Sequence, residues 1–113
     1  MLPAVNRMRR SRDFASVLSA GARARGGAVV VHQRAGMHGS APLVGLIVGK
    51  NVGGSVARHR VARRLRAQVA RRLDTLPAGS GTVVRALREA GGASSSELGA
   101  GLDQALGRLA ARR

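Results

Sequence analysis

The chain has 113 residues, and its 20 Lys and Arg residues against 5 Asp and Glu residues give a formal net charge of +15 at pH 7. This length allows a single small domain, over residues 1–113, and the absence of cysteine excludes disulfides, thiolate nucleophiles and cysteine-based zinc sites. The unbalanced charge favours a polyanionic partner, nucleic acid first and acidic membrane second, because phosphates relieve its self-repulsion.

The N-terminal part is predicted to be a basic tail, over about residues 1–10, followed by a short helix from Ser11 to Ala20. Apolar residues in this helix recur at i, i+3 and i+4, which is the spacing of an amphipathic helix; they are Phe14, Val17 and Leu18. Ser11 is the expected N-cap and Gly21 the expected end signal.

Three stretches rich in β-branched residues predict strands. They are AVVVHQR from Ala28, LVGLIVGK from Leu43 and GTVVRAL from Gly81. The residues between the first helix and Ala28 are expected to form a connector. The first two strands are separated by RAGMHGSAP, whose glycine, serine and proline indicate a loop, so we expect these strands to pair as a hairpin.

A long helix is predicted from Ser55, in SVARHRVARRLRAQVARRLDTL, which contains no Gly or Pro. One arc of about 120° is apolar and holds Val61, Ala62, Leu65, Val69, Leu73 and Leu76. The opposite arc of about 100° is cationic and holds Arg60, Arg63, Arg64 and Arg71. No acidic residue lies between Lys50 and Arg72, so we expect no i,i+4 neutralisation of this cationic face.

The last predicted element is a helix from the serine run at 94–96, any of which could be its N-cap, with Glu97 in its first turn and a flexible end at about 110–113. The element order is α-β-β-α-β-α. It predicts a single-domain α+β sandwich with a small mixed sheet.

Side-chain catalysis is not indicated. The five carboxylates are far apart, and the three histidines, His32, His38 and His59, lack metal-ligand spacing, so we expect neither a catalytic residue nor a metal site. Phosphate binding is better supported, because Gly53 and Gly54 precede the basic helix and leave backbone N–H groups free at its positive end. The same glycines would also serve a tight strand-to-helix turn, and no Walker motif is present.

The segment VGLIVGKNVGGSVARHRVARRLR, from Val44 to Arg66, resembles the signature of the bacterial ribonuclease P protein component. The matching positions are Lys50, Gly53, Ser55, Val56, Arg58, Arg60, Arg63 and Arg66. MRRSRDF, which ends at Phe14, resembles the basic stretch before the phenylalanine of the family's first helix. The chain departs from the family pattern at His59 (usually Asn), at Ala62 (commonly Lys) and at usually aromatic positions, which are here Leu18, Val29 and His32.

The resemblance covers about residues 7–109. It implies the protein subunit of a ribonucleoprotein endoribonuclease, in which a catalytic RNA subunit uses Mg²⁺ to remove the 5′ leader from precursor tRNA. The protein would assist both RNAs, without a cofactor or protein partner of its own. Independently of the resemblance, we expect a cytoplasmic protein, because the N-terminal segment has charge but no apolar run of the signal-peptide kind. The implied fold is ribosomal protein S5 domain 2-like, with a left-handed β-α-β crossover, which is rare in other proteins.

Two groups of RNA-contacting residues follow from the resemblance and the charge pattern. Those expected on the catalytic RNA are Lys50, Arg58, His59, Arg60, Arg63, Arg64, Arg66 and Arg71. Those expected in a cleft for the single-stranded leader are Arg9, Arg10, Arg12, Phe14, Val30 and His32. Phe14 has a competing interpretation as a core anchor, because a small core needs the burial of a large apolar side chain.

Other classes of protein stay open at this point. A small basic ribosomal or other structural RNA-binding protein would explain the charge and length, though not the signature. A membrane-active amphipath would carry large apolar residues on one face and would need no strands. The longest apolar stretch, LVGLIVG from Leu43, is too short to span a bilayer, and we expect no membrane partner.

Overall fold

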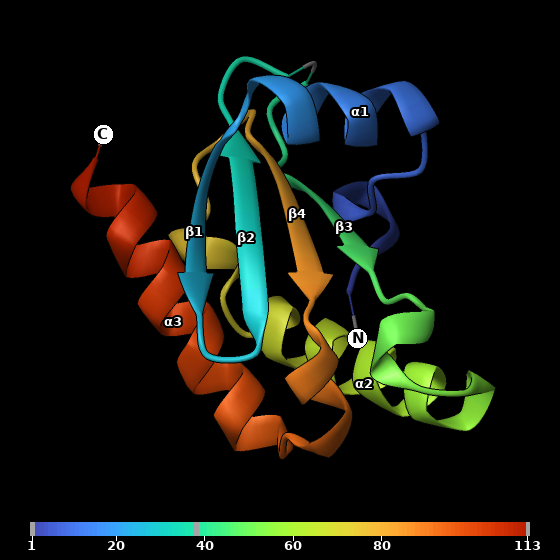
Figure 1. Cartoon of the computed structure of the whole chain (residues 1–113). Helices are drawn as coiled ribbons and strands as arrows, with labels where there is room; N and C mark the ends of the chain where they lie inside the picture. Colours follow the sequence, from blue (N-terminus) through green and yellow to red (C-terminus); the bar gives the residue numbers. More distant parts are fainter. Residues whose placement is uncertain (1, 38, 113) are drawn as a thin grey trace.

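The computed structural model describes residues 2–37 and 39–112 (Figure 1). The helices are α1 (Ser11–Ala20), α2 (Ser55–Ala70) and α3 (Ser95–Ala111), and the strands are β1 (Ala22–Gly26), β2 (Val29–Arg34), β3 (Leu43–Ile47) and β4 (Gly81–Ala86). Short 3-10 turns are η1 (Ala4–Asn6), η2 (Lys50–Val52), η3 (Leu73–Thr75) and η4 (Arg88–Gly92). The α+β class predicted from the sequence is confirmed. No helix among the described residues is both long and apolar enough to cross a membrane.

The sheet has the strand order β1-β2-β4-β3, with β3 parallel to β4 and the other neighbours antiparallel. The predicted hairpin of β2 and β3 is wrong, because β4 lies between these strands. The hairpin is formed instead by β2 and β1, where the sequence predicted only a connector. Strand β1 (ARARG) has no β-branched residue, and it pairs because its small residues Ala24 and Gly26 allow α3 to pack against it.

The two parallel strands are joined through α2. In Figure 1 both β3 and β4 point downward, β4 lies to the left of β3, and α2 lies behind the sheet. This arrangement makes the β3-α2-β4 crossover left-handed, whereas nearly all such units are right-handed. The handedness implied by the family resemblance is therefore confirmed.

Strand alternation divides the apolar residues between the two faces of the sheet. One face packs against α2 and α3 and forms the larger core, with Val31, Val84, Leu65, Leu98 and Leu102 all nearly inaccessible. The other face forms a smaller cluster with α1, built on Met8, Val17 and Val83. Figure 1 shows that α1 crosses only one end of this second face.

The predicted helix signals are partly correct. Ser11 is not an N-cap: it is the first residue of α1, and the cap position is Arg10, which makes no side-chain capping bond. Gly21 does end α1. At α3 the N-cap is Ser94, which accepts from the Glu97 N–H while the Glu97 carboxylate accepts from the Ser94 N–H. This reciprocal pair satisfies two of the N–H groups that a helix start leaves unbonded.

The chain ends lie against the edges of the sheet. Within the predicted basic tail, Leu2 and Met8 are buried, and the Met8 N–H donates to the Val44 carbonyl on the outer edge of β3. At the opposite edge, Arg108 and Arg112 of α3 donate to carbonyls of β1. Residue 1 of the predicted basic tail, residue 113 of the predicted flexible end, and His38 lie outside the described residues.

Candidate nucleic-acid interface

The turn between β3 and α2 brings backbone donors to the start of the basic helix. Gly53 has φ 145°, a conformation that favours glycine. The following residue, Gly54, is the N-cap, and as a glycine it has no side chain that could cap the helix. The N–H groups of the first turn of α2 therefore lie without a side-chain cap at the positive end of the helix, next to the exposed Lys50. This is the arrangement that binds anions at helix starts.

Basic side chains from successive turns of α2 form an outer surface, which we define as Arg58, His59, Arg63 and Arg66. Except for the partly buried Arg58, these residues are exposed. The Nε of Arg58 has no hydrogen-bond partner among the described residues. Beside this surface lies a hollow of about 260 Å³, lined by Val48, Ser55, Arg58, His59, Ala62 and Arg66. Its mixed lining offers phosphates cationic donors and offers riboses an apolar contact.

Arg60 and Arg64 do not share this surface. Arg60 donates to the Gly91 carbonyl at 3.0 Å, and Arg64 donates to the Ala93 carbonyl at 2.8 Å. Both therefore lie on the side of α2 that faces η4. The cationic face expected from helical spacing is split into two rows. The predicted apolar face is partly correct: Val61, Leu65 and Val69 are buried. Ala62 instead lines the outer hollow, and Leu73 and Leu76 lie beyond the end of α2.

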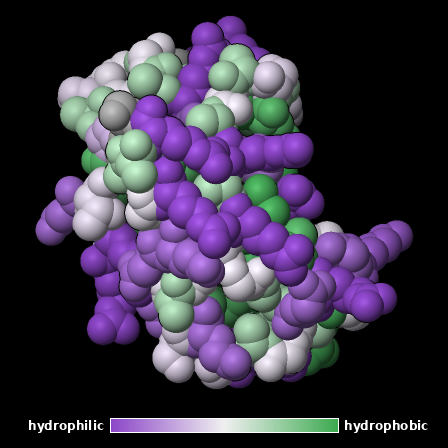
Figure 2. All heavy atoms as spheres, turned by 60° about the vertical axis from the view of Figure 1, so that its left-hand side comes forward, coloured by the Kyte–Doolittle hydropathy of each residue, from purple (hydrophilic) through white to green (hydrophobic). Residues whose placement is uncertain are grey.

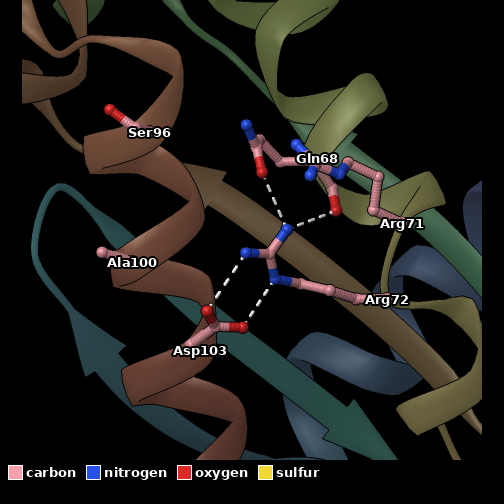
Figure 3. Close-up of a pocket in the computed structure, with 6 residues that line it drawn as sticks. All are labelled: Gln68, Arg71, Arg72, Ser96, Ala100 and Asp103. Atoms are coloured by element: carbon pink, nitrogen blue, oxygen red, sulfur yellow. Dashed lines mark hydrogen bonds and ion pairs between the residues drawn. The ribbon is translucent and has the colours of Figure 1, made fainter.

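Arg71 and Arg72 follow the end of α2 and line a third region, a hollow of about 460 Å³ between α2 and α3 (Figure 3). Arg72 holds both carboxylate oxygens of Asp103, with Nε–Oδ1 at 2.6 Å and Nη2–Oδ2 at 3.1 Å, and donates from Nη1 to Gln68. The neutralising carboxylate thus comes from α3, which local spacing could not reveal. Because every nitrogen of the Arg72 guanidinium donates within the chain, we interpret this group as a structural clamp.

The clamp makes a testable contribution to stability. The hydrogen bond from Arg72 lowers the pKa of the Asp103 carboxyl below its ordinary value of 3.8. The stability it adds is therefore present above pH 3.8 and is lost as the pH falls through the lowered pKa. Asp103→Asn should lower the free energy of unfolding at pH 7, because it removes the charge that Arg72 binds. The loss should be only about 1 kcal/mol, since the Asp103 side chain is 64% exposed and water screens the pair.

The matched control is Asp74→Asn, since Asp74 is exposed on η3. Urea titrations of both variants should show the loss only for Asp103→Asn, and the difference should shrink as the pH falls below 3.8. Equal midpoints for the two variants at pH 7 would contradict the clamp.

The predicted leader residues gather around the second face of the sheet. The Phe14 ring lies directly over Gly45 of β3, where any side chain would collide with it. Val30 and His32 lie on the same face, because the register places His32 beside Val83 and Val83 beside Gly45. Phe14 and His32 thus occupy one row of the sheet two strands apart, about 10 Å. Arg9, Arg10 and Arg12 are exposed at the start of α1.

His32 is the unusual member of this group. It is only 5% exposed, and neither ring nitrogen has a hydrogen-bond partner among the described residues. Burial lowers its pKa, and the nearby charges of Arg85 and Arg23 lower the pKa further. The imidazole is therefore neutral at pH 7 and keeps one donor and one acceptor. Buried polar atoms normally find partners, so the two unpartnered nitrogens make His32 an exception among the described residues.

Sequence reasoning missed four arginines near His32. A hollow of about 330 Å³ is lined by Arg23, Ala24, Arg25, Val30, Arg85 and Arg112. The available signal was the alternation of alanine and arginine in ARARG, which places Arg23 and Arg25 on one face once this segment is assigned as a strand. No group of three His, Cys, Asp or Glu side chains that could hold a metal ion occurs within residues 2–37 and 39–112.

Comparisons with known proteins identify relatives along the whole chain. The family model described as Ribonuclease P matches residues 2–110. The ribonuclease P protein component of Acidothermus cellulolyticus is 48% identical over 110 residues, which cover 96% of this chain and 92% of that protein. The component from Streptomyces bikiniensis is 49% identical over 117 residues, covering 96% and 95%.

Solved structures show the same fold at lower sequence identity. The RNase P protein of Staphylococcus aureus has a TM-score of 0.82 at 18% identity, covering 91% of this chain and 94% of that one. The RNase P protein of Thermotoga maritima has a TM-score of 0.75 at 20% identity, covering 87% and 92%.

Proposed function

The chain belongs to the ribonuclease P protein family, and from this premise we propose that it serves as the protein subunit of a ribonucleoprotein that removes the 5′ leader from precursor tRNA. The relatives described above are named ribonuclease P protein component or RNase P protein, and the matches cover nearly their full lengths. None of them is a ribosomal or other structural RNA-binding protein. The proposed partners are a catalytic RNA and the precursor.

We assign the hydrolysis to the RNA subunit and its Mg²⁺ ions. In support, three of the carboxylates are already engaged within the protein: Asp103 with Arg72, Glu97 with the α3 cap, and Glu89 with Arg25. Among the described side chains, no group of three His, Cys, Asp or Glu residues lies close enough together to hold a metal ion. The protein's role is then to bind and position the two RNAs.

The α2 outer surface is the proposed contact with the catalytic RNA. The observation that carries this assignment is the hollow beside the uncapped start of α2, because it combines backbone donors with the charges of Arg58 and Arg66. RNA helices are recognised mostly through phosphates and 2′-hydroxyls. A row of arginines beside a positive helix end suits that chemistry.

The second face of the sheet is the proposed groove for the leader. Phe14 offers the one aromatic side chain of the sequence, and the buried His32 lies at the other end of the same row. Single-stranded RNA is held by stacking and by hydrogen bonds to exposed base edges. This assignment competes with a core role for Phe14, since the ring also packs against the sheet.

Phe14→Leu distinguishes the two roles and tests the proposed groove. Leucine keeps much of the apolar volume over Gly45 and removes the aromatic surface on which a base stacks. The complex with the catalytic RNA should bind leader-bearing precursor about fivefold to tenfold more weakly, since stacking contributes about 1–3 kcal/mol per base and the aliphatic contact remains. Binding of mature tRNA should not change.

The control is Leu18→Ala, which truncates a 38% exposed residue of the same helix. Filter-binding titrations with precursor and mature tRNA, together with a thermal melt of each variant, separate the outcomes. A large fall in melting temperature for Phe14→Leu, with discrimination between precursor and mature tRNA intact, would assign the ring to the core and contradict a leader contact.

A further inference from the structure

The half of the second sheet face that α1 leaves uncovered carries a concentration of arginines. The register places Arg25 of β1, Val30 of β2 and Arg85 of β4 in one row across three strands. Arg23 lies beside His32 in the next row, and Arg112 reaches this edge from the end of α3, donating to the Arg23 carbonyl at 2.6 Å. Four positive charges therefore surround one hollow of about 330 Å³ with Val30 in its lining.

Two of these four guanidinium groups have no partner among the described residues. Arg25 pairs with Glu89 at 2.8 Å, which neutralises one charge. The side chains of Arg23 and Arg85 form no hydrogen bond or ion pair with any described residue, although Arg85 is partly buried in the sheet face. Like charges held together in this way repel one another unless an anion joins them. The hollow therefore has the charge of a phosphate site.

The position of the hollow relates it to the proposed leader groove. Phe14 lies over β3, His32 lies on β2, and the hollow lies over β1, β2 and β4. His32 lies next to the hollow, because it pairs with Arg23 across β1 and β2 and feels the charges of both Arg23 and Arg85. From β3 to β1 the sheet spans three strand spacings, about 14 Å. Figure 2 shows hydrophilic side chains crossing the middle of the face where β1 and α3 come forward.

We propose that this arginine hollow, formed by Arg23, Arg25, Arg85 and Arg112, binds backbone phosphates of the upstream part of the leader, beyond the nucleotides held near Phe14 and His32. The inference rests on the proposed function and extends it, because it gives the protein a second, purely electrostatic contact with the substrate. Phosphates are the same in every nucleotide, so a contact made to them reads the length of a leader and not its sequence.

The experiment measures the affinity of the reconstituted protein–RNA complex for precursors whose leaders are lengthened one nucleotide at a time. Wild type should gain affinity in two stages, the first at the groove and the second at the arginine hollow. Arg23→Gln/Arg85→Gln should lose the second stage and bind long-leader precursor about fivefold more weakly, the effect of one or two exposed charge contacts. Its log–log salt slope should fall by about 1.4, or 0.7 for each lost single-strand phosphate contact.

Two further variants make the result specific. Arg23→Lys/Arg85→Lys keeps both charges and should keep the second stage. Arg88→Gln removes one charge from exposed η4, outside the hollow, and should bind all precursors as wild type does. Because neither the Arg23 nor the Arg85 side chain is bonded to another described residue, the glutamine variant should melt as wild type does.

The possible failures are distinguishable. An equal loss for mature tRNA and for every leader length would place the hollow on the catalytic RNA and overturn the inference. Wild-type affinity of the glutamine variant for all leaders would show that no phosphate enters the hollow. Either result leaves the leader groove standing, whereas a wild-type complex that binds precursor and mature tRNA equally would overturn the proposed groove as well.

Discussion

Replacement of Arg58, Arg63 and Arg66 by glutamine should weaken binding of the chain to its catalytic RNA by about 100-fold at about 0.15 M salt. Each phosphate contact releases counterions, and at this salt concentration its loss lowers the logarithm of the binding constant by about 0.7. The same variant should lower the slope of log affinity against log salt by about 2.7, or 0.9 for each contact. These side chains lie together on the outer surface of α2, beside the hollow at its start.

The control for this variant removes three charges elsewhere. Arg34, Arg88 and Arg108 are all exposed and belong to other surfaces, so their replacement by glutamine should change the affinity for the catalytic RNA far less. Electrophoretic mobility titrations over a range of salt concentrations give both quantities. Equal slopes for the two triple variants would mean that the α2 outer surface is merely solvated and that only net charge attracts the RNA.

Gly101→Ala should destabilise the protein by at least about 3 kcal/mol, at the upper end of the cost of overpacking a core, and should lower the melting temperature by about 10 °C or more. A Cβ at position 101 would lie 2.5 Å from the Gly26 carbonyl oxygen and 3.2 Å from its carbonyl carbon. Both are backbone atoms of β1, so no side chain can move aside. Helix α3 would have to move away from the sheet.

The same substitution six residues further along α3 should have the opposite sign. A Cβ at Gly107 would meet nothing within 4 Å, so Gly107→Ala should stabilise the helix by about 0.5–1 kcal/mol through reduced backbone entropy in the unfolded chain. Thermal melts of the two variants test the pair. Similar melting temperatures would contradict the close contact between α3 and β1.

Elements with strong periodicity could be predicted from the sequence. The spacing of Phe14 and Val17 predicted a helix with the bounds that α1 has, and the β-branched runs predicted β2, β3 and β4. In these segments the local pattern and the tertiary packing agree. The basic helix also begins at Ser55 as predicted, but its α-helical part ends at Ala70, and η3 (Leu73–Thr75) follows it.

The features that sequence reasoning missed are set by distant parts of the chain. Strand β1 lacks strand-forming residues and depends on α3, whose Gly101 allows Gly26 to approach. The mistaken β2/β3 hairpin followed from loop length, but β4, which comes much later in the sequence, takes the position between these two strands.

The candidate site was predicted as a charge pattern and changed by its surroundings. Helical spacing identified the basic residues of α2, yet the carbonyls of Gly91 and Ala93 hold Arg60 and Arg64 on another side. Those acceptors lie more than twenty residues away in the sequence, so no local pattern could reveal them. The arginine hollow was missed for the same reason, since its members come from β1, β4 and α3.

The most direct test of the central claim is the removal of the 5′ leader from precursor tRNA by the cognate catalytic RNA at low Mg²⁺, measured with and without this chain. We predict efficient removal of the leader when both are present and none with the chain alone. The RNA alone should remove little, because the positive charge of the chain then no longer supplements the scarce Mg²⁺. Cleavage by the RNA-free chain, or no stimulation of its catalytic RNA, would contradict the account.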